Sequence, residues 1–230
     1  MSRTKIVAGN WKLNGNKALV SAFNNVFTDA KLDNISVMIF PPALYVNEFD
    51  CEQLIIGVML NDIGISHTLI GHSERRDLYH ENNDIIAAKV VTALAANITP
   101  ILCIGESLDI RTAGKVNEFI QAQLDSVIDT VGMTGLSKCI LAYEPIWAIG
   151  TGVTATPAQA QEVHAFIRDY LGSIDASVAQ SLSILYGGSV NAKTAPDLFA
   201  QPDIDGGLVG GASLKEEEFL TICQAANQRG

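Results

Sequence analysis

This chain contains eight short, almost continuously apolar runs, and longer amphipathic stretches separate most of them. The runs are Lys5–Gly9, Ser36–Phe40, Leu54–Val58, Thr68–Gly71, Pro100–Ile104, Cys139–Tyr143, Ser183–Tyr186 and Gly207–Gly210. Such runs are typical of parallel strands buried on both faces, because a strand with one wet face alternates apolar and polar residues. The fold must therefore cover eight strands on both sides.

Helical periodicity between the runs is clearest at residues 116–131 and after Thr156. Thr156-Pro157-Ala158-Gln159 fits a capping box with proline at the first helical position. Residues 16–29, 84–97 and 215–226 are also predicted to be helical. One face of the helix over 116–131 is formed by Val116, Phe119, Ile120, Leu124, Val127, Ile128 and Val131.

Strands that alternate with helices predict a parallel sheet with right-handed crossovers. Eight strands is the number that closes a (β/α)8 barrel, although an open doubly wound sheet could hold the same elements. The 230 residues are 48% hydrophobic, and no linker, tandem repeat or low-complexity tract divides them. We therefore expect an α/β fold in which residues 1–230 form a single domain, and the strand count favours a (β/α)8 barrel over the open sheet.

The formal net charge of −10 disfavours nucleic acid and anionic membrane surfaces as partners. The N-terminus has no apolar segment typical of a signal peptide, and no apolar run approaches the roughly 18 residues that span a membrane. An anionic substrate would need a local positive site, because the overall charge repels it. We expect a cytoplasmic protein without membrane or nucleic-acid partners.

The cysteines and histidines do not suggest a metal site. None of the cysteines forms a C-x-x-C pair, and His67, His80 and His164 have no partners at ligand spacing. We interpret the thiols as reduced, as in cytoplasmic proteins. The cysteines are Cys51, Cys103, Cys139 and Cys223.

Polar residues follow several of the predicted strands, at the end where a parallel barrel gathers its reacting groups. Asn10 and Lys12 follow the first run, His72 and Glu74 the fourth, and Glu144 the sixth. A glutamate there is a candidate general base, although it could equally pair with a neighbouring cation. His72 is a possible acid or electrophile or a structural histidine. Lys12 could hold a phosphate or a carbonyl oxygen, or be simply solvated.

Two glycine pairs follow the last two strands. Gly187-Gly188 precedes Ser189, and Gly210-Gly211 ends the eighth run. Backbone amides at such pairs can approach an anion closely, and barrels commonly bind phosphate there, although each pair alone could be a plain turn. The segment Pro145–Pro157 contains Gly150 and Gly152, which fits either a mobile lid or an ordinary loop.

Six segments, read together, resemble the triosephosphate isomerase family. GHSERR at 71–76 and AYEPIWAIGTG at 142–152 are the most specific. The others are GNWKLNG at 9–15, PILCIGE at 100–106, YGGSV at 186–190 and GLVGGASL at 207–214. They occur in the family's order and span nearly the whole chain.

The resemblance implies a (β/α)8 barrel that interconverts dihydroxyacetone phosphate and D-glyceraldehyde 3-phosphate, in glycolysis and gluconeogenesis, without a cofactor. It implies that Glu144 is the base that moves a proton between two carbons and that His72 is the electrophile at the carbonyl oxygens. Lys12 and Asn10 would bind and polarise the substrate. The remaining roles are phosphate binding by Gly150, Ser189, Gly210 and Gly211, and support of the site by Ser73, Glu74 and Cys103.

Two segments are shorter than the family pattern, at Asp50–Cys51 in the second helix and at Val58–Met59 in the third loop. The family's homodimer is expected, but its third loop reaches into the partner subunit, so the short loop puts the dimer in doubt. Three explanations fit the gaps: the loop has been removed, disordered residues have been left out of the chain, or the chain is a relative that has lost activity. We favour the second slightly, because both gaps fall where surface segments can be disordered.

Overall fold

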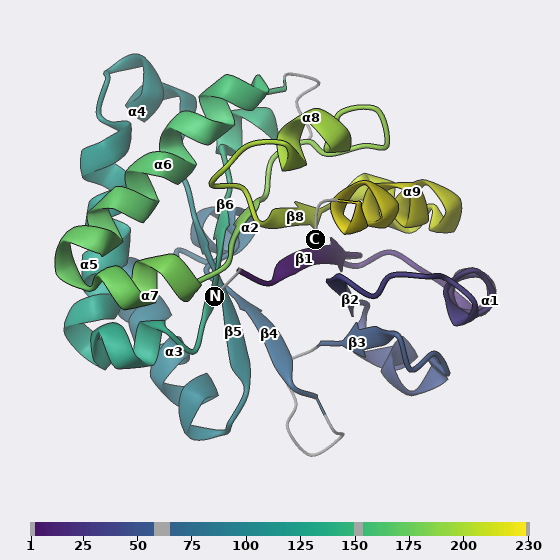
Figure 1. Cartoon of the computed structure of the whole chain (residues 1–230). Helices are drawn as coiled ribbons and strands as arrows, with labels where there is room; N and C mark the ends of the chain where they lie inside the picture. Colours follow the sequence, from purple (N-terminus) through teal and green to yellow (C-terminus); the bar gives the residue numbers. More distant parts are fainter. Residues whose placement is uncertain (1–2, 58–64, 150–153, 229–230) are drawn as a thin grey trace.

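Eight parallel strands form the centre of the computed structural model, which describes residues 3–57, 65–149 and 154–228 (Figure 1). Each strand overlaps one of the eight predicted runs, so the prediction of the strands is confirmed. The strands are β1 (Lys5–Asn10), β2 (Ile35–Phe40), β3 (Leu54–Ile56), β4 (His67–Ile70), β5 (Thr99–Ile104), β6 (Ile140–Tyr143), β7 (Ile184–Tyr186) and β8 (Gly206–Val209).

The strand order is β3-β2-β1-β8-β7-β6-β5-β4, and every pair is parallel. The first and last strands in the sequence thus pair with each other, with Ile6 opposite Gly206. No ladder joins β3 and β4 within the described ranges. They nevertheless approach each other, because a Cβ placed on Gly57 would lie 2.9 Å from the His67 carbonyl oxygen. The sheet is therefore a nearly closed barrel, and the open doubly wound alternative is excluded.

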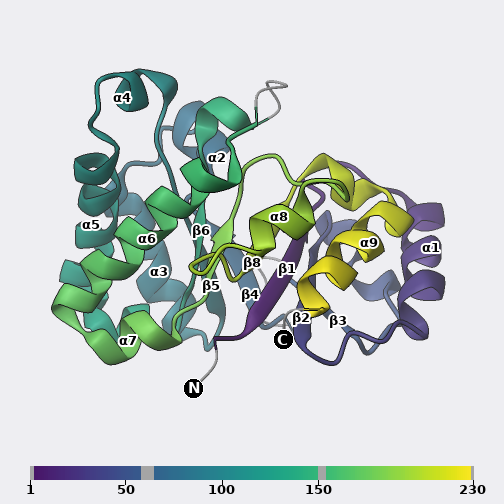
Figure 2. The ribbon, with the colours of Figure 1, turned by 45° about the horizontal axis from the view of Figure 1, so that its top comes forward.

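Helices surround the barrel (Figure 2). The helices predicted over 16–29, 84–97, 116–131 and 215–226 and after Thr156 are all present, and Thr156 and Gln159 form the predicted capping box. The α-helices are α1 (Lys17–Thr28), α2 (Ser73–Leu78), α3 (Asn83–Ala95), α4 (Leu108–Thr112), α5 (Val116–Leu136), α6 (Pro157–Ile174), α7 (Ala176–Ser181), α8 (Ala195–Phe199) and α9 (Glu216–Asn227). The 3-10 helices in the described ranges are η1 (Ala43–Glu48), η3 (Ile146–Ala148) and η4 (Gly211–Leu214).

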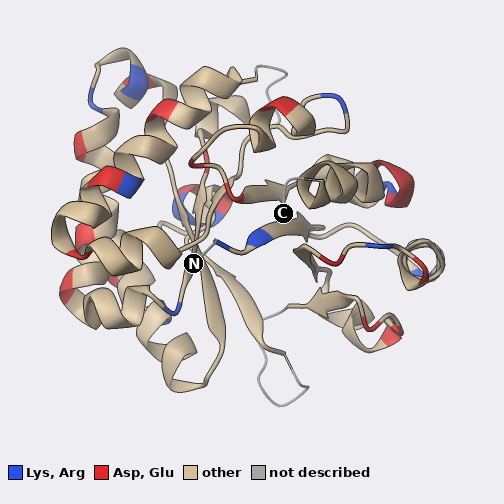
Figure 3. Cartoon of the chain, viewed as in Figure 1, with Lys and Arg blue, Asp and Glu red and all other residues tan. Residues whose placement is uncertain are grey.

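The core has two layers, which explains why the strand sequences are apolar on both faces. Met38, Leu185 and Leu208 belong to the inner cluster of the barrel. Ile39 and Ile184, their neighbours along the chain, belong to the larger cluster under the helices. Lys5 is the one charged residue in the eight described strands, and Figure 3 shows the acidic residues spread over the surrounding helices and loops.

Only η1 occupies the place of a second helix between β2 and β3, as expected from the short sequence there. The ring of Phe49 packs 5.6 Å from that of Trp11, and the Leu54 N–H donates to the Cys51 carbonyl at 3.1 Å. The chain thus enters β3 through one tight turn. The Val58–Met59 junction and the shortened third loop lie outside the described residues. No helix in the described part of the chain is long and apolar enough to cross a membrane.

Candidate active site

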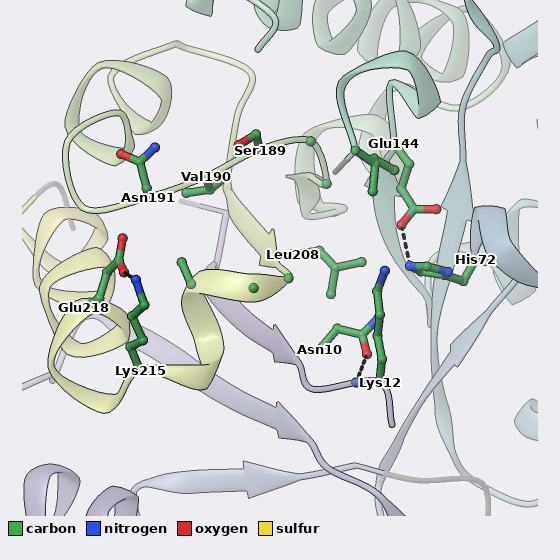
Figure 4. Close-up of a pocket in the computed structure, with 16 residues that line it drawn as sticks. Asn10, Lys12, His72, Glu144, Ser189, Val190, Asn191, Leu208, Lys215 and Glu218 are labelled. Atoms are coloured by element: carbon green, nitrogen blue, oxygen red, sulfur yellow. Dashed lines mark hydrogen bonds and ion pairs between the residues drawn. The ribbon is translucent and has the colours of Figure 1, made fainter. Parts of the chain in front are cut away.

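A cavity of about 370 Å³ opens at the carboxyl ends of the strands (Figure 4). It brings together the predicted residues Asn10, Lys12, His72, Glu144 and Ser189, together with the two glycine pairs. The predicted convergence of strand-end residues is therefore confirmed. Gly150, the remaining residue predicted to bind phosphate, lies outside the described residues.

Glu144 follows β6 directly and is 3% exposed. The Ser73 N–H donates to its Oε2 at 3.0 Å, and His72 Nε2 lies 3.2 Å from its Oε1. Burial raises the pKa of the Glu144 carboxyl, and the opposing effects of His72, the Ser73 N–H, Lys12 and Arg76 do not cancel it. A carboxylate with a raised pKa is a stronger base than an exposed one, which suits proton transfer from carbon.

His72 caps the N-terminus of α2, and this contact fixes its tautomer. The Glu74 N–H donates to His72 Nδ1 at 3.3 Å, so this nitrogen accepts a hydrogen bond. A neutral ring then carries its proton on Nε2, the nitrogen that faces Glu144 and the cavity. His72 is therefore arranged to donate a hydrogen bond into the cavity.

Lys12 is held at the cavity in a rare backbone conformation, with a φ of 54°. Its N–H donates to Asn10 Oδ1 at 3.0 Å, which links the two residues (Figure 4). Its Nζ pairs with Glu74 Oε1. Burial raises the pKa of Glu74, but its hydrogen bond with Lys12 and the charge of Lys12 outweigh this, so the pKa lies below the ordinary value. Backbone strain at such a position is a common feature of functional sites.

Glycines expose the backbone along another part of the cavity. Gly210 and Gly211 line it, and a Cβ on either would meet no atom within 4 Å. Ser189 and Lys215 also line the cavity, and Lys215 Nζ pairs with Glu218 Oε2 at 3.2 Å (Figure 4). Accessible amides and a lysine are the groups that bind phosphate in proteins. Lys215 was not predicted as a site residue, and its position four residues after the second glycine pair was the available signal.

The predicted supporting residues differ in their contacts. Ser73 contacts Glu144 through its backbone, and Glu74 contacts both Lys12 and His72. Cys103 lies in the inner cluster of the barrel and does not line the cavity. Burial and the nearby Glu144 charge raise the Cys103 pKa well above its usual range, so this thiol is neutral. Its support is therefore limited to packing.

A second carboxylate, Glu106, organises the segment after Glu144 and was missed by the sequence analysis. Its Oε1, on a fully buried side chain, accepts hydrogen bonds from Tyr143 Oη at 3.0 Å and Trp147 Nε1 at 2.8 Å. Arg111 Nη1 lies 3.3 Å from the same oxygen, and its guanidinium stacks 4.8 Å from the centre of the Trp147 ring. The glutamate in the sequence Gly105-Glu106, directly after a buried strand, was the available signal.

No group of three or more His, Cys, Asp or Glu side chains in the described part of the chain could hold a metal ion. The groups at the cavity include one buried carboxylate, one imidazole, the ammonium groups of Lys12 and Lys215 and several amides. Together they can move a proton, polarise an oxygen and bind an anion.

Comparison with known proteins identifies the family of this chain. The sequence model of the family "Triosephosphate isomerase" matches residues 53–226. A triosephosphate isomerase of Xanthomonas euvesicatoria pv. vesicatoria (strain 85-10) is 47% identical over 247 residues, which cover 97% of this chain and 98% of the relative. One from Pseudoalteromonas translucida (strain TAC 125) is 44% identical over 243 residues, covering 98% of each. These alignments are longer than the 230 residues here, so they contain gaps in this chain.

Proposed function

This chain belongs to the triosephosphate isomerase family, and we propose that it interconverts dihydroxyacetone phosphate and D-glyceraldehyde 3-phosphate. It is thus an aldose–ketose isomerase, and we place its reaction in glycolysis and gluconeogenesis. The observation that carries the proposal is the position of Glu144, whose carboxylate lies 3.2 Å from His72 Nε2 in the cavity lined by the glycine pairs.

Glu144 acts as the carbon base in this mechanism. It removes a proton from C1 of the ketose phosphate, and the electrons of the broken C–H bond form the C=C bond of an enediolate. Transfer of the hydroxyl proton from O1 to O2 and return of the carbon proton to C2 give the aldose, so no net oxidation occurs and no cofactor is needed. In the structure the carboxylate accepts a hydrogen bond from the Ser73 N–H, which lowers its pKa. When the Glu144 carboxylate turns toward the substrate carbon and loses this hydrogen bond, its pKa rises and it becomes a stronger base.

His72 and Lys12 stabilise the oxygens on which negative charge develops. The Nε2–H of neutral His72 donates to the carbonyl oxygens, a pairing of base and imidazole that is known for this family. Lys12, with Asn10 beside it, supplies positive charge at the same end of the cavity. Donors fixed in advance are effective because they need no reorganisation during the reaction.

The phosphate of the substrate is bound by the amides of Gly210 and Gly211 and by Ser189, with Gly150 as the expected further donor. Supporting this assignment, both glycines line the cavity and leave open space where a side chain would be. A local site of this kind overcomes the repulsion between a phosphate and a protein of net charge −10. The proposed ligand is therefore a small phosphorylated triose.

A coupled assay of the purified, folded protein tests the function directly. Turnover of either triose phosphate is the expected result. Tight binding of a substrate analogue without turnover would instead identify a phosphate-binding barrel that has lost activity. The shortened third loop is the reason to test for this outcome. Pentose and indole-linked phosphosugars serve as control substrates, and preferential turnover of one of them would assign the barrel to another isomerase.

The pH dependence of kcat/KM is expected to report the raised pKa of Glu144. The base works only when ionised, so kcat/KM rises as pH increases through this pKa. Because burial raises the pKa above its ordinary value of 4.5, the acid limb is expected to have its midpoint above pH 4.5. Measurement of kcat/KM across the acid range checks this. A midpoint at or below 4.5 would contradict the assignment of a buried Glu144 as the base.

We also propose that the chain forms a homodimer in the cytoplasm. An apolar groove of about 350 Å³ lies beside Lys12 and Glu74, with Leu13 97% exposed at its edge. Exposed apolar side chains around such a groove favour a protein partner. The four cysteines are free and buried, which fits a reducing compartment. Sedimentation equilibrium is expected to give twice the mass of one chain, and a monomer at micromolar concentration would exclude the dimer.

A further inference from the structure

Gly105 lies against the backbone of Glu144, just beyond the end of β5. The Glu144 N–H donates to the Ile104 carbonyl at 2.7 Å, and the Ile146 N–H donates to the Glu106 carbonyl at 3.1 Å. The segments that follow β5 and β6 thus remain hydrogen-bonded to each other. Gly105 lies between the two residues whose carbonyls accept these bonds, Ile104 and Glu106. A Cβ on Gly105 would lie 1.8 Å from the Glu144 carbonyl oxygen, so the two backbones are in direct contact.

Both polar backbone groups of Gly105 pair with one side chain, that of Gln123. Gln123 Oε1 accepts from the Gly105 N–H at 2.9 Å, and its Nε2 donates to the Gly105 carbonyl at 3.2 Å. Gln123 comes from the middle of α5 and is 4% exposed. A carboxamide has the required donor and acceptor on one rigid group.

Gln123 makes the hydrogen bonds to Gly105 that a neighbouring strand would otherwise make. The pairing of β4 with β5 ends at Ile70 and Leu102, because the chain turns away at Gly71. Beyond this point Arg76 Nη2 donates to the Cys103 carbonyl at 3.0 Å, and Gln123 takes both groups of Gly105. Without Gln123, two buried backbone groups would lose their partners, and the Gly105 backbone would be held only by its contacts with the segment that carries Glu144.

We propose that Gln123 is a positioning residue for the isomerisation: it holds the Gly105 peptide, against which the Glu144 backbone rests, and so aims the Glu144 carboxylate. This inference rests on the proposed function. Lys215, on the proposed phosphate side, lies across the cavity from Glu144 in Figure 4. Gln123 therefore acts on proton transfer rather than on phosphate binding.

The main test is Gln123→Met, which keeps the length of the side chain and removes both hydrogen bonds. We expect kcat to fall roughly tenfold to a hundredfold, the effect of a small misplacement of a reacting group, with little change in KM. The matched control is Gln121→Met on the same helix, where the side chain is exposed and kcat should match wild type.

Gln123→Glu provides a conservative rescue that depends on pH. Its protonated carboxyl group has one donor and one acceptor, like the carboxamide, whereas the ionised form cannot donate to the Gly105 carbonyl. The ratio of its kcat to that of wild type should be near one at the acid end of the assay and fall where the carboxyl ionises. The ratio for Gln123→Met should be low at every pH. A residue that only stabilises the fold would not produce this difference.

The outcomes separate this inference from the proposed function. If wild type turns over and Gln123→Met has the wild-type kcat, only the role of Gln123 is overturned. A Gln123→Glu ratio that is low at every pH also overturns it, and this measurement decides the matter if Gln123→Met does not fold. A folded wild-type protein without turnover overturns the proposed function together with the inference.

Discussion

Turnover by the Glu144→Gln variant is expected to fall by roughly 10²- to 10⁴-fold, the range over which a positioned general base accelerates proton transfer. Glutamine has the size of glutamate and can keep the hydrogen bond from the Ser73 N–H, which spans 3.0 Å in the native protein. It cannot remove a proton from carbon. The measurement is kcat in the coupled assay, in both directions of the reaction.

Binding of a phosphate ligand should survive this substitution. Glu144 lies beside His72, whereas Gly210 and Gly211 form a different wall of the cavity. The dissociation constant of glycerol 3-phosphate, which has the phosphate but no carbonyl group, is therefore expected to change little. Glu162→Gln, on the exposed face of α6, makes the same chemical change away from the cavity and serves as the control. Unchanged turnover in Glu144→Gln would remove Glu144 from its role.

The strands and the main helices could be predicted because their signals are local. A parallel strand covered on both faces is a short apolar run, and the helix at Thr156 has its start signal in four consecutive residues. The pattern of eight strands favoured closure of the barrel but could not decide it, because closure depends on which strands pair. The pairing of β1 with β8 decides it, and these strands lie about 200 residues apart.

The positions of site residues were predictable where each one ends or follows its own strand, as Asn10, His72 and Glu144 do. The resemblance to a known family then separated catalytic roles from the structural alternatives. Glu106 and Gln123 were missed because their roles depend on contacts across the fold. Gln123 is one of several polar residues on α5, and nothing in the local sequence shows that it pairs with Gly105, 18 residues earlier. A buried polar side chain on a helix is recognisable only after its neighbours are known.

His72→Phe is expected to lower kcat by roughly 10²- to 10³-fold, because it removes one fixed donor to the developing oxyanion. Phenylalanine fills the space of the imidazole but lacks both Nε2–H and the Nδ1 acceptor that caps α2. Loss of the cap is expected to reduce the free energy of unfolding by about 1 kcal/mol, which a denaturant titration would measure. The protein should therefore stay folded while its activity falls.

The pH profile of His72→Phe makes the prediction specific to the contact between His72 and Glu144. His72 opposes the effect of burial on the Glu144 carboxyl more than any other neighbour does, so its loss should raise the Glu144 pKa further. The acid limb of kcat/KM should then move to higher pH than in wild type. His72→Gln keeps a side-chain N–H at this position and should retain more activity than His72→Phe. Equal activity of the two variants would show that a hydrogen bond from residue 72 does not drive the reaction, and an unmoved acid limb would show that Glu144 titrates independently of His72.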